Sequence, residues 1–270
     1  MSLLHPERAR SFDAWANDYD RYRPGYPEVL FQEIRDRLSL PDQPLVVDLG
    51  AGTGRASLAM ATLGWRVTAV EPGKPMLDVL RAQAADHGLV LATVQATAEA
   101  TGLDPETADL ATAAQSFHWF AQAAAVTEMA RIVKPSGGVA FFWNVRDAER
   151  SPFVADYHAM LEQRFGDADT GQYLQAGRAT GRERTQEAFR SAPGFEMPQL
   201  AELHHDAHVT PEEFVGMAFT ASYVRSLPPE EQDRFRRELE ALLARHGLVS
   251  GARFTLPYRI DLWTARRHPA

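Results

Sequence analysis

The chain has 270 residues and no cysteine, which excludes a disulfide framework, a thiolate zinc site and a cysteine nucleophile. No apolar run approaches the roughly 20 residues that a membrane span requires, and the residues after Met1 lack the apolar core of a signal peptide. The sequence also contains no internal repeat and no low-complexity tract. From these absences we expect a globular protein of the cytoplasm.

An excess of basic charge is missing as well. The 28 lysines and arginines stand against 36 aspartates and glutamates, which gives a net charge of −8. A nucleic-acid binder needs a basic surface to displace the counterions of the phosphates. The charge balance therefore argues against a nucleic-acid partner.

Short apolar runs and helical periods alternate along the chain. Runs typical of buried strands lie at 45–50, 65–72, 89–97, 108–115 and 139–145, with helical segments at 27–38, 55–64, 74–88 and 121–133 and a turn at 134–138. Strands and helices in this order form right-handed βαβ units and an open parallel sheet. Two further strands, at 199–209 and 253–267, enclose helical segments and predict a late hairpin that completes the sheet. We expect the helices at 152–165 and 211–246 to form a cap, and the charged stretch at 180–187 to be solvated surface.

Three glycines, Gly50, Gly52 and Gly54, separate the first strand from its helix. Glycines permit a tight turn and a close approach of a ligand to the backbone. A dinucleotide fold would need a small residue where Arg55 stands, which argues against a nicotinamide oxidoreductase. Glu71 closes the second strand, where a carboxylate can accept both hydroxyls of a ribose. A glycine loop can also be an ordinary turn, but Glu71 and the order of the units favour a cofactor site.

These motifs together resemble the class I S-adenosylmethionine-dependent methyltransferases. The resemblance rests on DLGAGTG, on VEP with Glu71, on QATAE after the third strand, on AQSFHWF after the fourth and on KPSGG before the fifth. YDRYRPGYP and LPYRIDLW further resemble small-molecule methyltransferases of the trans-aconitate and fungal dithiol S-methyltransferase type. The resemblance implies a Rossmann-like class I methyltransferase fold, with a mostly parallel seven-stranded sheet, helices on both faces and a helical cap.

Within one structural domain, the resemblance implies four regions. Residues 1–40 would be a helical lid over the cofactor and 41–146 the cofactor-binding core. Residues 147–198 would be a helical cap and substrate region, and 199–270 the final strands with inserted cap helices. The cofactor would be S-adenosyl-L-methionine and the product S-adenosyl-L-homocysteine.

The same resemblance implies a set of cofactor-binding residues. The glycine loop would line the methionine part with Asp48 near its amino group, Glu71 would hold the ribose, and the residues after the second and third strands would surround the adenine. An N-terminal group would close over the cofactor. The full set is Tyr19, Arg23, Tyr26, Asp48, Gly50, Ala51, Gly52, Thr53, Gly54, Glu71, Pro72, Met76, Thr97, Ala98, Glu99, Gln115 and Ser116.

His118 is the candidate general base, because it stands just past the fourth strand, at the edge where such sheets bind ligands. The alternative is that His118 and Trp119 form a wall of the crevice, which we favour because the family carries this motif with different acceptors. His118, Trp119, Trp143 and Asn144 are the candidate substrate-binding residues. HHDAH at 204–208 alternates two histidines and an aspartate on one strand face, but we expect it to lie away from the crevice and predict no metal site.

The predicted function is methyl transfer to an oxygen or sulfur nucleophile of a small molecule. The alternatives are a catalytically inactive S-adenosylmethionine-binding sensor or scaffold, and a methyltransferase acting on protein or tRNA. We expect a small-molecule acceptor as partner, no nucleic acid, no membrane, and a monomer or homodimer.

Overall fold

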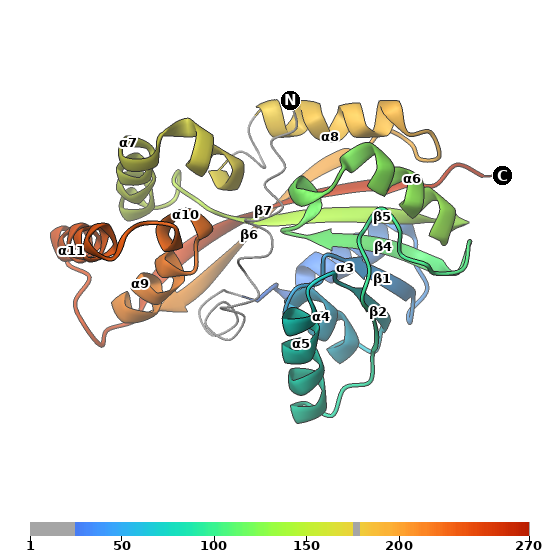
Figure 1. The fold of residues 1–270 in the computed structure, drawn as a ribbon, viewed down its shortest axis with the longest axis horizontal. Helices are drawn as coiled ribbons and strands as arrows, with labels where there is room; N and C mark the ends of the chain where they lie inside the picture. The colour runs from blue at the N-terminus through green and yellow to red at the C-terminus, as the bar shows by residue number, and fades with distance from the viewer. Residues whose placement is uncertain (1–24, 175–178, 270) are drawn as a thin grey trace.

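The computed structural model describes residues 25–174 and 179–269, with side chains except between 167 and 181. In this part of the chain, seven strands form one sheet in the order β3-β2-β1-β4-β5-β7-β6 (Figure 1). Its strands are β1 (Leu45–Leu49), β2 (Arg66–Val70), β3 (Ala92–Val94), β4 (Ala108–Ala114), β5 (Val133–Arg146), β6 (Gln199–Val209) and β7 (Phe254–Arg266). The first five are parallel, and β7 is antiparallel to both β5 and β6. The mostly parallel sheet and its late hairpin are confirmed.

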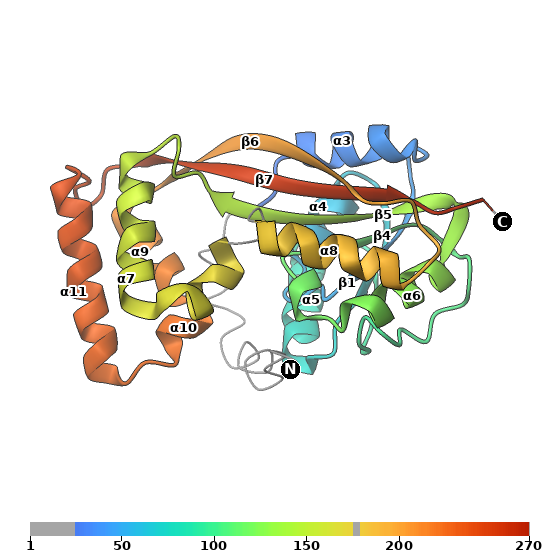
Figure 2. The same cartoon turned by 90° about the horizontal axis from the view of Figure 1, so that it is seen from above.

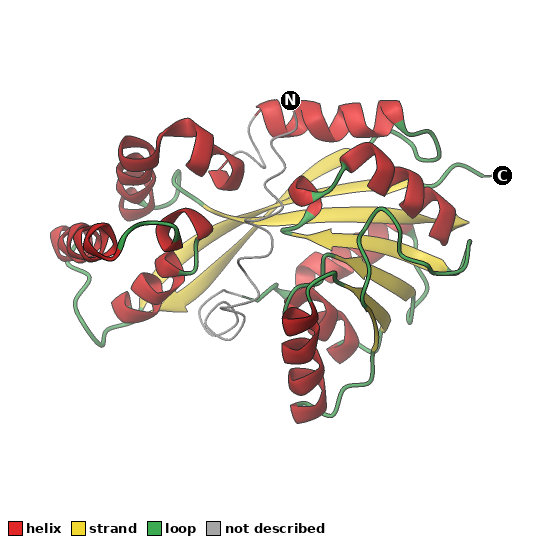
Figure 3. Cartoon of the chain, viewed as in Figure 1, coloured by secondary structure: helices red, strands yellow, loops and turns green. Residues whose placement is uncertain are grey.

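Helices cover both faces of the sheet (Figure 3). They are α3 (Glu28–Leu38), α4 (Arg55–Thr62), α5 (Lys74–Asp86), α6 (Gln122–Ile132), α7 (Pro152–Leu174), α8 (Ala179–Ser191), α9 (Pro211–Phe219), α10 (Ser222–Arg225), α11 (Pro229–Arg245) and the 3₁₀ turn η2 (Phe117–Trp119). None of the described helices is long and apolar enough to cross a membrane.

Two apolar layers hold these helices to the sheet. On one face α6 and α8 pack over β1, β4 and β5, where the rings of Phe117 and Phe141 stack with centroids 4.1 Å apart. On the other face α3 and α4 pack over the same strands, and Phe31 meets Phe142 edge to face at 6.2 Å. Strands covered on both faces need continuous apolar runs, which is why β1 and β4 have so few polar side chains.

Two predicted boundaries change. KPSGG does not form a separate turn, because Val133 already pairs with Ala108 and the ladder resumes only at Gly138 with Leu110. The segment is thus a bulge inside a long β5. The third strand shrinks to three residues because it lies at the sheet edge and pairs only with β2.

The cap is built on the far ends of the long strands. Strands β5, β6 and β7 have 11 to 14 residues, against five in β1 and β2, and Figure 2 shows them running from the core to the cap helices. Helices α7, α9, α10 and α11 share a separate apolar core with the ends of β6 and β7. A capping box starts α9 directly after β6: the Thr210 hydroxyl accepts from the Glu213 amide, and the Glu213 carboxylate accepts from the Thr210 amide.

Helix α8 does not belong to this cap. It runs through the charged stretch that we expected to be solvated surface, and its inner side buries Ala188 and Phe189 in the sheet layer beside α6. Its charges point outward as predicted, but the periodic apolar positions between them anchor it to the core.

Arg164 joins two cap helices. Its guanidinium on α7 lies 2.6 Å from Glu231 and 2.7 Å from Glu238, both on α11, and the side chain is only 15% exposed. Replacing Arg164 by Met should lower the free energy of unfolding by on the order of 1–3 kcal/mol, because two carboxylates lose their shared partner. Chemical denaturation would measure this loss. An unchanged unfolding midpoint would show that the cap does not depend on this pair.

Candidate active site

The carboxyl ends of β1, β2, β4 and β5 meet at one edge of the sheet. Because the strands are parallel and adjacent, Gly50, Glu71, Gln115 and Asn144 all lie along that edge. The strand order reverses between β1 and β4, and open α/β sheets bind ligands in the crevice at such a point. The cap helices stand beyond this edge (Figure 2).

The glycine loop is shaped for close contact. Gly50, Gly52 and Gly54 have φ values of 63°, 58° and 90°, in the region that other residues rarely adopt. A Cβ at Gly50 would lie 2.8 Å from the Ser116 Cβ, and one at Gly54 would lie 2.5 Å from the Leu80 Cγ. At Gly52, by contrast, no atom lies within 4 Å of such a Cβ. The loop is therefore packed on two sides and open at Gly52.

Glu71 and Thr53 add polar groups to the loop. One Glu71 oxygen accepts from the Gly52 amide at 3.0 Å and the other from the Gly73 amide at 2.9 Å, so the carboxylate links the loop to the turn after β2. The Thr53 Oγ1 is buried and has no hydrogen-bond partner among the described residues. A buried polar atom without a partner is uncommon and indicates a place for a ligand or water.

Asp48 lies beneath the loop. Its side chain is fully buried, and its two oxygens accept from the Ser57 hydroxyl at 2.6 Å and the Thr112 hydroxyl at 2.8 Å. Burial raises the pKa of Asp48 to about 6, against the lowering effect of the two hydroxyls. Asp48 therefore fastens β1 to β4 and α4, and in this structure its carboxylate has no surface from which to touch a cofactor amino group. That expected contact would require these bonds to open.

The residues predicted around an adenine lie on two neighbouring loops. Pro72 is exposed, Met76 is buried in the first turn of α5, and Thr97 and Ala98 follow β3, Thr97 exposed and Ala98 buried. Glu99 accepts from the Ala121 amide at 2.8 Å and so satisfies the first residue before α6. The structure thus gives Glu99 a helix-capping contact that the sequence did not suggest.

His118 is held by Trp143. The indole Nε1–H of Trp143 donates to the His118 Nδ1 at 3.2 Å, and the His118 and Trp119 rings lie 4.9 Å apart. Burial lowers the pKa of His118 to about 4, so the imidazole is neutral at pH 7. An indole can only donate, which makes Nδ1 the acceptor and puts the proton of the neutral ring on Nε2. Neither ring nitrogen then offers a lone pair to an acceptor hydroxyl.

Gln115 and Ser116 bind the ends of neighbouring strands. The Gln115 side chain donates to the Asn144 carbonyl at 3.1 Å, and the Ser116 hydroxyl donates to the Leu49 carbonyl at 2.9 Å. Gln115 also has a φ of 56°, a strained value for a residue with a side chain. Both residues thus brace the edge. Trp143 is buried in the sheet core, and the Asn144 amide donates to the Gly25 carbonyl at 3.2 Å.

Of the three predicted lid residues, Tyr19 and Arg23 lie outside the described residues. Tyr26 is described, and its ring meets Phe142 at 5.0 Å, next to the carboxyl end of β5. The chain around Tyr26 therefore reaches the predicted crevice. Its packing against the core accounts for much of the ring surface.

Sequence reasoning misplaced HHDAH. The His205 Nε2 lies 3.2 Å from the Asn144 Oδ1, and the His204 Nδ1 lies 3.1 Å from an Asp147 oxygen, so side chains of β6 reach across β7 to the carboxyl end of β5. The register explains this, because β7 pairs with both strands and brings them close. No group of three or more histidines and carboxylates in the described residues could hold a metal.

Sequence reasoning also missed Arg146, the last residue of β5. It lies directly opposite Tyr258 of β7, which in turn lies opposite His205 of β6, so the three form a row across the sheet. The available signal was a charged residue at the end of an otherwise apolar strand, at the ligand-binding edge.

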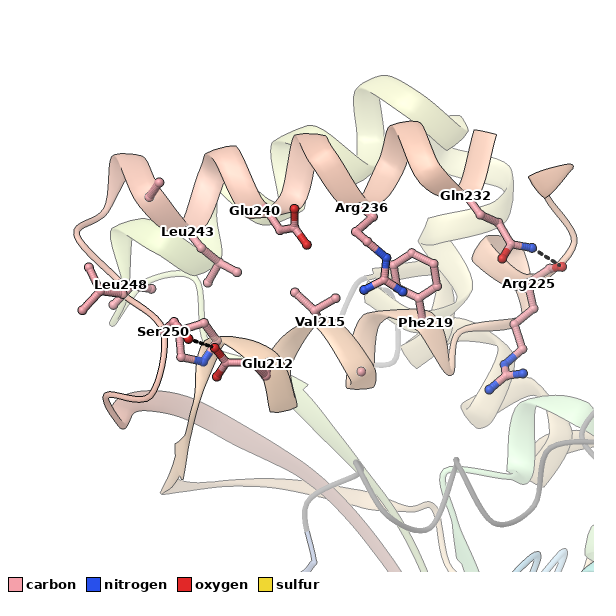
Figure 4. A pocket seen from close by; sticks show the side chains of 14 residues that line it. Glu212, Val215, Phe219, Arg225, Gln232, Arg236, Glu240, Leu243, Leu248 and Ser250 are labelled. Atoms are coloured by element: carbon pink, nitrogen blue, oxygen red, sulfur yellow. Dashed lines mark hydrogen bonds between the residues drawn. The ribbon is translucent and has the colours of Figure 1, made fainter. Parts of the chain in front are cut away.

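A cavity of about 800 Å³ lies elsewhere, between α9 and α11 in the cap (Figure 4). Its walls carry Val215 and Leu243, and the Arg236 guanidinium lies over the Phe219 ring at 4.3 Å. None of the predicted cofactor or substrate residues lines it.

Asp48 makes stability depend on pH in an unusual direction. Because folding raises its pKa from 3.8 to about 6, Asp48 contributes most to stability below pH 4 and loses that contribution as the pH rises through 6. Asp48→Asn should remove this component, worth up to roughly 3 kcal/mol. Unfolding free energies of both proteins between pH 4 and 8 would test this. A difference between variant and wild type that is constant over this range would contradict it.

Comparisons with known proteins identify the family. A family model described as a methyltransferase domain matches residues 47–141. An uncharacterised methyltransferase of Mycobacterium tuberculosis is 30% identical over 259 residues, 96% of each protein, and one of Schizosaccharomyces pombe is 29% identical over 237 residues, 87% of each.

Solved structures agree on the fold. A protein of Anaeromyxobacter dehalogenans, provisionally named a type II methyltransferase, has a TM-score of 0.65 at 23% identity, covering 92% of this chain and 100% of its own. A Haemonchus contortus phosphoethanolamine N-methyltransferase with bound S-adenosylhomocysteine has a TM-score of 0.53 at 14% identity, covering 100% of this chain and 61% of its own. Because the match to the mycobacterial relative spans nearly the whole of both proteins, and the matched domain contains the glycine loop, this chain belongs to the class I S-adenosylmethionine-dependent methyltransferases.

Proposed function

We propose that this protein transfers a methyl group from S-adenosylmethionine to an oxygen or sulfur nucleophile of a small molecule. The observation that carries the proposal is the neutral, hydrogen-bonded His118 at the crevice, which leaves positioning as the main source of catalysis. A thiol with a pKa near 8.5 and an ionised carboxylate need little help from a base.

The edge of the sheet suits this donor. The open face at Gly52 gives room for a ligand to approach the backbone, the Thr53 hydroxyl is available to one, and the Glu71 carboxylate is fixed at the end of β2. We assign the methionine part to the loop from Gly50 to Gly54, the ribose to Glu71, and the adenine to the segments around Met76 and Ala98. When bound, S-adenosylmethionine supplies an activated methyl group on a sulfonium.

The chain's own contribution is alignment. Gln115 and Ser116 tie the ends of three strands together, and His118 with Trp119 stands where the acceptor would enter, so these residues set the direction of approach. Alignment of this kind supplies about 7–11 kcal/mol, whereas a general base adds about 10²–10⁴-fold in rate.

A small acceptor fits the surroundings of this edge. The cap helices stand beyond it (Figure 2), as expected for a region that covers a small acceptor, and the net charge of −8 disfavours tRNA. Cytoplasmic location, a monomeric or homodimeric state and membership of the narrower trans-aconitate and thiol methyltransferase subgroup remain predictions from the sequence.

Glu71→Ala should weaken binding of S-adenosylhomocysteine on the order of ten- to hundredfold, because hydrogen bonds to a charged group are strong. Isothermal titration calorimetry would measure the loss. Asp86→Ala, an exposed carboxylate at the end of α5, is the matched control and should bind as the wild type does. Unchanged affinity in Glu71→Ala would refute the assigned ribose site.

His118→Gln should lower kcat less than tenfold, because glutamine can still accept from Trp143 and no proton transfer is lost. The kcat of the wild type should also show no ionisation that disappears in the variant, which the lowered pKa of His118 would place near pH 4. A loss above a hundredfold, together with such an ionisation, would show that His118 is a base after all.

Turnover separates an enzyme from an inactive binding protein. Purified protein with labelled S-adenosylmethionine would be offered thiols, phenols and carboxylic acids, and methylated products would be detected by mass spectrometry. Cofactor binding without any methylated product across the panel would favour a sensor or scaffold.

A further inference from the structure

Arg146 is a cation that the fold encloses without a counterion. Its Nε is buried with no hydrogen-bond partner, and no described carboxylate forms an ion pair with its guanidinium. Two other partly enclosed arginines do have acidic partners: Arg164 is paired with two glutamates, and Arg259 lies 2.7 Å from Asp261. An enclosed charge without an ion-pair partner destabilises the folded state, and the Tyr258 hydroxyl that hydrogen-bonds Arg146 carries no opposite charge. Stability of the folded state therefore does not explain why an arginine stands at this position.

Aromatic rings surround this guanidinium. It lies 5.3 Å from the centre of the Tyr157 ring on α7 and 5.5 Å from that of Phe214 on α9. Tyr258, opposite it on β7, donates its own hydroxyl to the Met217 sulfur. Burial acts to lower the pKa of Arg146, but the hydroxyl groups of Tyr258, Tyr157 and Tyr223 outweigh it, so the pKa is raised and the group stays charged.

The position of Arg146 connects it to the crevice. It ends β5 two residues after Asn144, roughly 7 Å along a strand from a residue at the predicted active edge. Its contacts with α7 and α9 show that the side chain extends into the cap. Because residues two positions apart on a strand share a face, Arg146 lies on the same face of β5 as Asn144.

We propose that Arg146 binds a carboxylate carried by the methyl acceptor, with the buried rings of Tyr157 and Phe214 supporting the guanidinium from behind. This inference rests on the proposed function and names the acceptor's chemical class. A guanidinium presents a planar fork that matches a carboxylate. A single cation balances one negative charge, whereas a phosphate monoester, with a charge near −2, would leave excess charge among aromatic rings.

The test uses benzoate as the probe and benzamide as its neutral isostere. Full-length protein saturated with S-adenosylhomocysteine would be titrated with each, and affinities measured by ligand-observed NMR. Benzoate should bind the wild type roughly tenfold or more tightly than benzamide. In Arg146→Met this ratio should fall to about one, and Arg146→Lys should give an intermediate ratio because it keeps the charge without the fork.

Arg236 provides the matched control. It also lies over an aromatic ring, Phe219, but in the separate cavity between α9 and α11 (Figure 4). Arg236→Met should leave the ratio of benzoate to benzamide affinity unchanged. An equal effect of both variants would show general electrostatic attraction and overturn the proposal.

Stability separates a binding role from a structural one. Arg146→Met should unfold at the same temperature as the wild type or higher, because an uncompensated charge is removed. A large loss of stability in Arg146→Met, together with an unchanged ratio in Arg146→Lys, would make Arg146 a structural residue. Absence of benzoate preference in the wild type would also overturn the proposal.

Calorimetry with S-adenosylhomocysteine on the same preparations distinguishes a failure of the carboxylate site from a failure of the proposed methyltransferase function. Normal cofactor binding with no dependence on Arg146 would refute only the carboxylate site. Absence of cofactor binding would refute the proposed function itself. Once an acidic acceptor is found, Arg146→Met should raise its KM more than it lowers kcat.

Discussion

The hydrogen bonds of the buried Asp48 hold together the part of the fold on which everything else depends. One carboxylate, without any exposed surface, binds hydroxyls of α4 and β4 and sits on β1 itself. A group buried so completely is tolerated only because both of its oxygens are satisfied. The three elements it connects carry the glycine loop and the start of the His118 segment, so the spacing of the crevice follows from this one set of contacts.

Around that centre, polar side chains form hydrogen bonds with backbone carbonyls at the strand ends or with each other. Ser116 binds the end of β1, Gln115 binds the end of β5, and Trp143 donates to His118. These bonds make the edge rigid, and burial keeps His118 neutral, which suits catalysis by alignment. Among the groups that the fold encloses without full compensation are the Thr53 hydroxyl and the Arg146 guanidinium. One lies at the proposed donor site and the other at the proposed acceptor site.

The long strands β5, β6 and β7 explain how one sheet serves both sites. Their amino-acid patterns continue beyond the core, and the helices between β6 and β7 must then fold over their far ends. Arg146, Tyr258 and His205 line up across these three strands because the antiparallel register places them opposite one another. The cap and the parallel core are therefore built on the same three strands, which connect the proposed acceptor site to the proposed donor site.

Local sequence patterns were enough to predict the order of elements, the glycine loop and the position of Glu71 at the end of the second strand. Periodicity, turn residues and strand ends each depend on only a few neighbouring residues. These patterns also predicted the late hairpin to within a residue or two. Only the tertiary structure decided that Asp48 is sealed under the loop, that Trp143 fixes the tautomer of His118, and that HHDAH adjoins Asn144. These contacts join residues 25 to 64 positions apart, and which partner a side chain meets depends on strand register. The surroundings of Arg146 were also decided by the tertiary structure, because the sequence does not show which aromatic rings contact an arginine at the end of an apolar strand.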